Sequence, residues 1–408
     1  MESEFFGTER ISRILMRLAP PVMLAQLIQA LYNIVDSFFV GRFSDTGLTA
    51  LSIVYPLQLL MIALAVGTGV GINTAMAYFL GTRDRKRSDE AAGISTALSL
   101  VMWAVFALLA AVLMPAYARM STESEAVIAD VICVTNIVLD PLLIFGLFDL
   151  PALGIAGAAI ATVAGQIVAA AIVWRGGYRR SPAQALYPAL VRRVYRLGIP
   201  NILMQSAYTF YILGLNLILS TFSDQAVTAL GLYYKWQTFF FIPLGAMQTC
   251  IVPVISYNYA AGSLDRCRKT LRESILAGMA LMLIGTLCFE LIPGPMLRFF
   301  SRDAEVIAIG TYGFRWIGPS FLPMVTSLIF PVFFQAVGSA GKSSLLTILR
   351  TVVLFVPLGW LFAHWGLHAF WLTYPVTELI TTAVGFLFYR QFLRAEAADG
   401  AAAPQTAE

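Results

Sequence analysis

Long apolar segments alternate with short charged or Gly/Pro-containing stretches along most of the chain. A helix that crosses a hydrocarbon core of about 30 Å needs about 20 apolar residues. Eleven segments approach or exceed that length, at residues 11–40, 47–79, 87–115, 131–148, 153–174, 197–221, 226–259, 270–295, 305–337, 344–363 and 367–389. Several are longer than one crossing requires, which indicates tilted helices or helices that extend beyond the bilayer. The pattern therefore predicts an all-α integral membrane protein.

The composition agrees with this prediction. Of 408 residues, 59% are hydrophobic and 12% are charged, whereas about 25% of an average soluble domain is charged. The four cysteines lack CxxC spacing and the two histidines stand alone, so we expect no disulfide framework, no metal site and no bound cofactor. Residues 1–17 mix charges with short apolar runs and lack a small-residue cleavage signal, so no removable signal peptide is predicted.

Most lysines and arginines fall in loops on one side of the predicted bundle. They cluster at residues 10–17, 83–87, 175–196 and 266–272, with Lys342, Arg390 and Arg394 in addition. Because cytoplasmic loops carry an excess of Lys and Arg, we assign this side to the cytoplasm of a bacterial inner membrane, with both termini cytoplasmic. The net charge of +4 then reflects contact with anionic lipid headgroups, and no nucleic-acid partner is expected.

The two halves of the sequence repeat each other at an offset of 179 residues. Gln26 and Tyr32, for example, correspond to Gln205 and Tyr211. Such duplication is typical of secondary transporters. The predicted parts are a first lobe at 1–180, a cytoplasmic linker at 181–196, a second lobe at 197–394 and a disordered, alanine-rich tail at 395–408.

The repeat also predicts that the first lobe lacks its fourth helix. The offset jumps to 216 where Pro141 aligns with Pro357, so about 35 residues are missing from the first half. The lobes would then contain five and six helices. One crossing fewer conflicts with placing both 83–87 and 175–196 in the cytoplasm. Either one segment between them fails to cross the bilayer, or residues 117–130 return through the protein in a non-helical path. We expect 131–148 to be the abnormal segment.

Three motifs resemble those of one transporter family. LYNIVD at residues 31–36, PVISYNYAAG at 253–262, and NIVLDP at 136–141 with GIAGAAIAT after it lie in the predicted helices. They resemble the first, eighth, fifth and sixth helices of the multidrug and toxic compound extrusion (MATE) family, in its bacterial branch. The resemblance covers nearly the whole chain.

This resemblance implies a V-shaped pair of helical lobes that is a transporter rather than an enzyme. We expect the protein to be a monomer. The resemblance also implies export of amphipathic organic cations in exchange for protons or Na⁺. The family's sodium-linked acidic residues on the seventh and tenth helices have no counterpart here, where Gln205, Tyr208 and Gln335 are found. That difference favours protons over sodium.

Asp36 is the leading candidate for the proton-coupling group. It lies about mid-helix among Ile34, Val35 and Phe38, where a lone charge is costly, so a carboxyl group that gains and loses a proton is expected there. Asn136 and Asp140, four residues apart, would share one helix face and form a second proton-linked pair with it. The alternative for all three is a structural role in which neighbouring polar groups satisfy the side chains.

A cavity for apolar cations would be lined by aromatic, methionine and amide groups. The candidate substrate-binding residues are Gln26, Tyr32, Met204, Gln205, Tyr208, Tyr211, Gln237 and Gln335. Each could equally be a packing residue of the bundle. Lys235 is a further substrate-binding candidate that would gate access or pair with Asp36. The alternative is a lysine that reaches the outer interface past an aromatic belt. Arg350 and Glu378, on the last two helices, could pair with each other.

The sequence also suggests three other interpretations. AVGSAGKS at residues 336–343 is close to a phosphate-binding loop, but it follows an apolar helix rather than a strand, so we predict a tight loop and no ATP-driven pump. A lipid-linked oligosaccharide flippase would prefer a strongly cationic cavity, and a member without its fourth helix could be inactive in transport. Both remain alternatives to an antiporter that works by alternating access.

Overall fold

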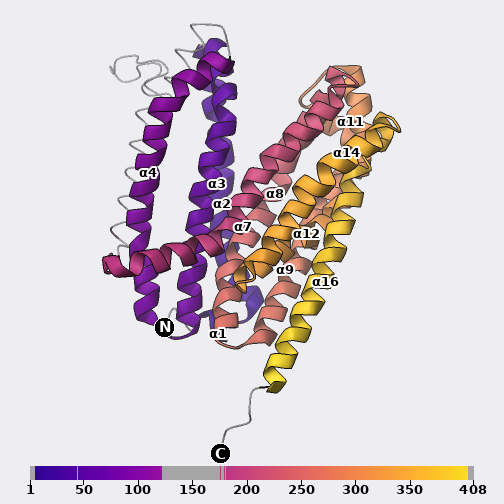
Figure 1. The fold of residues 1–408 in the computed structure, drawn as a ribbon. Helices are drawn as coiled ribbons and strands as arrows, with labels where there is room; N and C mark the ends of the chain where they lie inside the picture. The colour runs from indigo at the N-terminus through magenta and orange to yellow at the C-terminus, as the bar shows by residue number, and fades with distance from the viewer. Residues whose placement is uncertain (1–4, 44, 122–174, 176–178, 180, 403–408) are drawn as a thin grey trace, which may run out of the picture.

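The computed structural model describes residues 5–43, 45–121, 175, 179 and 181–402, and these form helices and connecting turns (Figure 1). The prediction of an all-α membrane protein is confirmed. Among the described residues, eight helices are long and apolar enough to cross a membrane. The side chains of 29–59 and of most residues between 103 and 121 are outside this description.

The first lobe contributes the short helix α1 and three long helices. They are α1 (Phe5–Thr8), α2 (Ile11–Phe43), α3 (Asp45–Gly81) and α4 (Arg85–Ser121). Each long helix covers the corresponding predicted segment and extends beyond it. The predicted segments 131–148 and 153–174 lie outside the described residues, as does the place where a fourth helix is predicted to be missing.

The second lobe begins earlier than the sequence indicated. Its elements up to residue 336 are η2 (Gln184–Leu186), α7 (Tyr187–Leu219), α8 (Asp224–Ala260), α9 (Leu264–Leu291), α10 (Pro293–Arg298), α11 (Ala304–Ile317), η3 (Gly318–Ser320) and α12 (Phe321–Ala336). Helix α7 thus includes more than half of the expected linker, residues 187–196 of 181–196. The predicted helix 305–337 is broken at Gly318, just before Pro319, because proline has no backbone N–H for a continuous helix.

Turn and cap chemistry explains where several of these helices begin and end. The Ser223 hydroxyl accepts a hydrogen bond from the Ala226 N–H at 3.1 Å and caps α8. The Asp303 carboxylate accepts the Glu305 N–H at 2.8 Å and caps α11. Gly338, with φ of 78°, follows α12 and forms the tight turn predicted within 336–343.

The remaining elements are α13 (Ala340–Ile348), the π-helix η4 (Leu349–Phe355), α14 (Val356–Ala363), α15 (Leu367–Phe370) and α16 (Thr373–Ala402). The expected disordered tail is therefore helical as far as Ala402. Its alanine content explains this, because alanine has the highest helix propensity of all residues. Instead of one continuous helix at 344–363, α13, η4 and α14 form a helix with a wide central turn.

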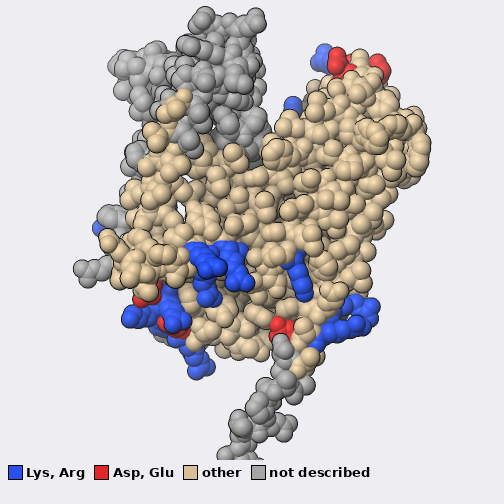
Figure 2. All heavy atoms as spheres, in the orientation of Figure 1, with Lys and Arg blue, Asp and Glu red and all other residues tan. Residues whose placement is uncertain are grey.

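The helices of the two lobes form a V (Figure 1). Helices α2, α3 and α4 diverge from the second lobe toward the end where α11 and α14 are labelled, and they meet it at the opposite end. That second end contains α1, the start of α4 and the last turns of α16. Lysine and arginine gather toward it (Figure 2), so we call it the basic end.

Close contacts join the lobes at the basic end. A Cβ placed on Gly71 of α3 would lie 2.3 Å from the Val194 carbonyl oxygen of α7, so glycine is needed for this helix approach. The Ser256 hydroxyl of α8 donates to the Thr74 carbonyl of α3 at 3.1 Å. Arg266 of α9 donates to the carbonyls of Phe6 and Glu9 at 2.8 and 2.7 Å. These contacts hold the lobes together at this end of the V.

Candidate functional site

A buried ion pair lies in the interior of the second lobe. Arg350 of η4 donates from Nη2 to Oε1 of Glu378 of α16 at 2.5 Å, and from Nε to both carboxylate oxygens at 3.1 Å. The Ser327 hydroxyl of α12 donates to the same carboxylate. Glu378 is fully buried and Arg350 is 6% exposed. The pairing that the sequence suggested is therefore found, with three helical elements joined at one carboxylate.

The π-helix places Arg350 in this position. Residues 349–355 form one wide turn between α13 and α14, and such turns often mark functional sites in helical proteins. The Arg350 guanidinium also lies 5.0 Å from the ring centre of Phe355, within cation–π distance. Because the pair is mutually neutralised, it brings no net charge into the lobe.

A layer of tyrosines surrounds the ion pair. Tyr211 of α7 stacks on Phe355 with ring centres 4.7 Å apart, and the hydroxyls of Tyr234 and Tyr374 are 3.3 Å apart. Tyr233 packs against Tyr374 at 5.2 Å, and its own buried hydroxyl has no hydrogen-bond partner among the described residues. The arrangement offers ring faces and neutral hydroxyl groups, which are suited to contacts with polarisable or cationic organic groups.

Three of the predicted substrate-binding residues meet at this layer: Tyr211, which belongs to it, and Tyr208 and Gln237 beside it. The Tyr208 hydroxyl donates to Oε1 of Gln237 at 3.3 Å, and the rings of Tyr208 and Tyr211 are 5.2 Å apart. Tyr211 and Gln237 are buried, and Tyr208 is half-buried. Along α7, Met204 is half-buried and Gln205 is exposed.

The other predicted residues are spread over the molecule. Gln26 of α2 approaches α8, because a Cβ on Gly245 would lie 3.2 Å from its Oε1. Gln335 is buried and donates to the Leu197 carbonyl at 2.7 Å, so it joins α12 to α7 and is not part of the tyrosine layer. Lys235 is exposed, with Nζ 5.1 Å from the Phe300 ring centre, a position that fits a lysine beside outer aromatic rings.

The structure does not describe the side chains of the three proton-coupling candidates. Asp36 and Tyr32 lie within α2, but their side chains are among those not described. Asn136 and Asp140 lie outside the described residues altogether. Among the described residues, no group of three or more His, Cys, Asp or Glu side chains converges to hold a metal ion.

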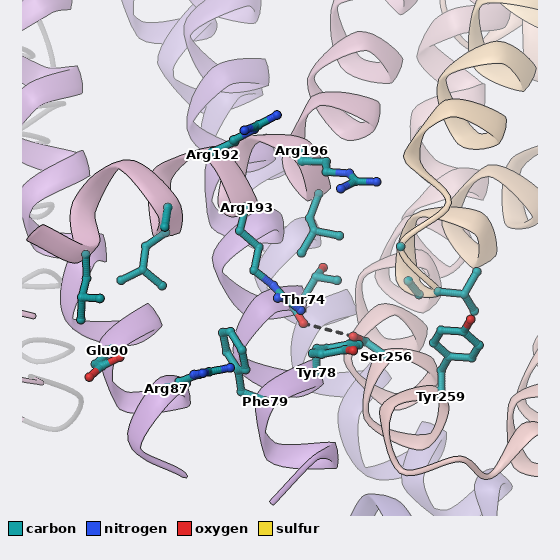
Figure 3. Close-up of a pocket in the computed structure, with 17 residues that line it drawn as sticks. Thr74, Tyr78, Phe79, Arg87, Glu90, Arg192, Arg193, Arg196, Ser256 and Tyr259 are labelled. Atoms are coloured by element: carbon teal, nitrogen blue, oxygen red, sulfur yellow. Dashed lines mark hydrogen bonds between the residues drawn. The ribbon is translucent and has the colours of Figure 1, made fainter. Parts of the chain in front are cut away.

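A second feature, which sequence reasoning missed, is a basic cavity of about 620 Å³ between the lobes (Figure 3). We call it the basic pocket. It is lined by parts of α3, α4, η2, α7, α8 and the end of α12, including Tyr78, Phe79, Arg87, Arg192, Arg193 and Arg196. The sequence showed these arginines only as charges of a cytoplasmic linker. The signal that could have revealed the pocket is the spacing of residues 192, 193 and 196, which lie within about one helical turn.

The fold defines a class of protein: a multi-pass helical membrane transporter built from two repeated lobes. The chain belongs to the MatE family, the MATE transporters, because the family model matches residues 21–173 and 200–361. The two matches begin at the two repeats expected from the sequence. The family predicted from sequence motifs is thereby confirmed.

Individual relatives and solved structures agree with this assignment. The chain is 23% identical over 421 aligned positions to the FAD transporter of Shewanella oneidensis, covering 91% of this chain and 92% of the relative. It is 22% identical to the multidrug export protein MepA of Staphylococcus haemolyticus, with 89% and 90% covered.

Similarity to solved structures concerns the fold. A MOP superfamily transporter from Pyrococcus furiosus superposes with a TM-score of 0.86 at 21% identity, covering 97% of this chain and 99% of the other. The outward-facing conformation of a multidrug resistance MATE family transporter superposes with a TM-score of 0.83, with the same identity and coverage. The V seen in Figure 1 is thus a shape that MATE transporters adopt.

Proposed function

We propose that the chain exports amphipathic organic cations in exchange for protons, by alternating access of the two lobes. The observation that carries this proposal is Asp36, an acidic residue in the middle of an apolar helix of a two-lobed transporter. Its position in the second repeat is occupied by Leu215, so only the first lobe has a carboxyl group at this place. A coupling ion is then handled by one lobe alone.

The second lobe supplies groups suited to the cation. Ring faces of Tyr208 and Tyr211, with the Gln237 amide, attract positive charge without forming a permanent ion pair. Relatives named as multidrug export proteins support this choice of substrate class. The coupling ion is expected to be H⁺ rather than Na⁺, since the second lobe lacks the family's sodium-linked acids.

The orientation of the protein in the membrane determines which side the V opens to in the proposed mechanism. If the basic end faces the cytoplasm, as the excess of Lys and Arg favours, the V opens to the outside and both termini lie in the cytoplasm. Deprotonated Asp36 would attract the cation in the inward-open state. After the lobes rock outward, a proton from outside would neutralise Asp36, weaken the attraction and release the cation.

Transport in inverted membrane vesicles tests this proposal. Asp36→Asn is expected to abolish proton-driven transport of a fluorescent lipophilic cation, because the amide cannot exchange a proton. Asp224→Asn, which removes an exposed acid at the start of α8, is the matched control and is expected to transport normally. Undiminished transport by Asp36→Asn would remove this residue from the mechanism, and a silent wild-type protein would favour the transport-inactive alternative.

A second candidate substrate is a flavin dinucleotide, because one relative is named an FAD transporter. The arginines of the basic pocket favour an anion at the basic end of the molecule. The same vesicles distinguish the two candidates. Uptake of FAD without uptake of lipophilic cations would replace the cation proposal by this one.

A further inference from the structure

We propose that the basic pocket binds a phosphate group carried on an organic molecule, either the headgroup of an anionic phospholipid or a soluble phosphate ester. This goes beyond the transport proposal, and it rests on that proposal only for placing the pocket on the cytoplasmic side. The four arginines of the pocket come from α4 and α7, and the pocket is shared by both lobes.

Most of the positive charge of the pocket is uncompensated. Among the described residues, no carboxylate forms an ion pair with Arg192, Arg193 or Arg196, whereas Arg87 is partly neutralised by Asp84 at 3.3 Å. Glu90 is the one acidic residue among those that line the pocket. An excess of guanidinium groups repels organic cations and attracts anions, so the pocket is unsuited to the proposed export substrate.

Arg193 is held in place to bind a ligand. Its guanidinium carbon lies 4.5 Å from the ring centres of both Tyr78 and Phe79 of α3, and Figure 3 shows the side chain pointing down from α7 toward them. Its Nε is buried and has no hydrogen-bond partner among the described residues. A buried donor without a partner is costly, so an acceptor oxygen from a ligand would stabilise it.

The oxygens of a phosphate group are suitable acceptors for these donors. Guanidinium groups bind phosphate oxygens through two parallel hydrogen bonds, and a stacked guanidinium is already oriented for this geometry. The volume of about 620 Å³ leaves room for an organic body beyond a phosphate group, since small-molecule sites typically measure about 300–1,000 Å³. Leu186, Leu190 and Leu197 line the pocket and offer apolar contacts to such a body.

Because the pocket lies between the lobes, a ligand bound in it would influence the conformation of the protein. The walls of the pocket include Thr74 of the first lobe and Ser256 of the second, which are hydrogen-bonded to each other at 3.1 Å (Figure 3). Separation of the lobes at the basic end would break this hydrogen bond and divide the arginines of α7 from Arg87 of α4 and from the aromatic rings of α3. A ligand that needs both lobes therefore favours the state in which the basic end is closed.

Binding to the purified full-length protein in phosphatidylcholine nanodiscs tests the proposal. The soluble probe is inorganic pyrophosphate, titrated calorimetrically. The lipid probe is phosphatidylglycerol, mixed into the nanodiscs and counted by native mass spectrometry after release. The variant Arg192→Gln/Arg196→Gln removes two exposed pocket charges and leaves the packed Arg193 in place. Arg10→Gln/Lys86→Gln removes two exposed basic residues outside the pocket and is the matched control.

At least one probe is expected to bind the wild-type protein, with affinity lowered about tenfold in the pocket variant and less than twofold in the control. Retention of phosphatidylglycerol alone would identify a lipid headgroup, and binding of pyrophosphate alone would identify a soluble phosphate ester. Failure of both probes to bind, or an equal loss in both variants, would overturn the proposal. Since neither probe reports on cation transport, an inactive Asp36 would leave this result unaffected.

Discussion

At the scale of single residues, buried charges explain what the sequence could and could not predict. Arg350 and Glu378 stand alone in apolar segments, and a lone charge there needs a partner, so their pairing could be expected without a structure. Lys235 is exposed in the structure. The sequence alone could not decide between an internal role near Asp36 and a position at the outer interface, because a long lysine side chain can reach the interface from within an apolar segment. The partner of Gln335 could not be foreseen, because it is a backbone carbonyl of α7.

The buried ion pair leads to a prediction on stability. Glu378→Gln should destabilise the protein by about 3–5 kcal/mol, because it leaves the Arg350 charge buried without compensation. The measurement is thermal unfolding in detergent, followed by tryptophan fluorescence. The double variant Arg350→Met/Glu378→Leu removes both charges and should recover most of the lost stability. Equal losses in the single and double variants would show that packing, not charge, dominates at this position.

At the scale of helices, hydrophobic length located most elements but not their internal breaks. The apolar segments predicted α2, α3, α8 and α9 well. The break at Gly318–Ser320 and the π-turn at Leu349–Phe355 depend on how neighbouring helices pack, which hydrophobic length does not express. The start of α7 was missed because its first turns carry several arginines and were interpreted as a polar linker. The basic pocket was missed for a related reason, since its walls come from six elements that are far apart in the sequence.

The contact between α3 and α7 provides a prediction at this scale. Gly71→Val should lower the unfolding temperature and impair transport, because the new side chain would meet the Val194 carbonyl and force the helices apart. An effect of about 1–3 kcal/mol is expected from such overpacking. Gly69→Val is the matched control on the same helix, because nothing lies within 4 Å of a Cβ at that position. Similar behaviour of the two variants would argue against a close α3–α7 contact.

At the scale of the whole molecule, the two lobes have different tasks in this account. The first lobe contains Asp36, whereas the equivalent position of the second lobe is Leu215. The two repeats therefore differ at the proposed proton-coupling position. The second lobe contributes the tyrosine layer and a neutral ion pair. Both lobes meet at the basic end, where Ser256, Thr74 and the basic pocket connect them. Rocking about this end would alternate access to the binding groups between them.

The central claim is that substrate and proton compete for the carboxyl group of Asp36. The most direct test is proton release from the purified protein when an organic cation binds, measured with a pH-indicator dye in weakly buffered solution. The wild-type protein is expected to release about one proton for each cation that it binds. The Asp36→Asn variant is expected to release no proton on addition of the cation. Stoichiometric cation binding by the wild-type protein without proton release would contradict the claim.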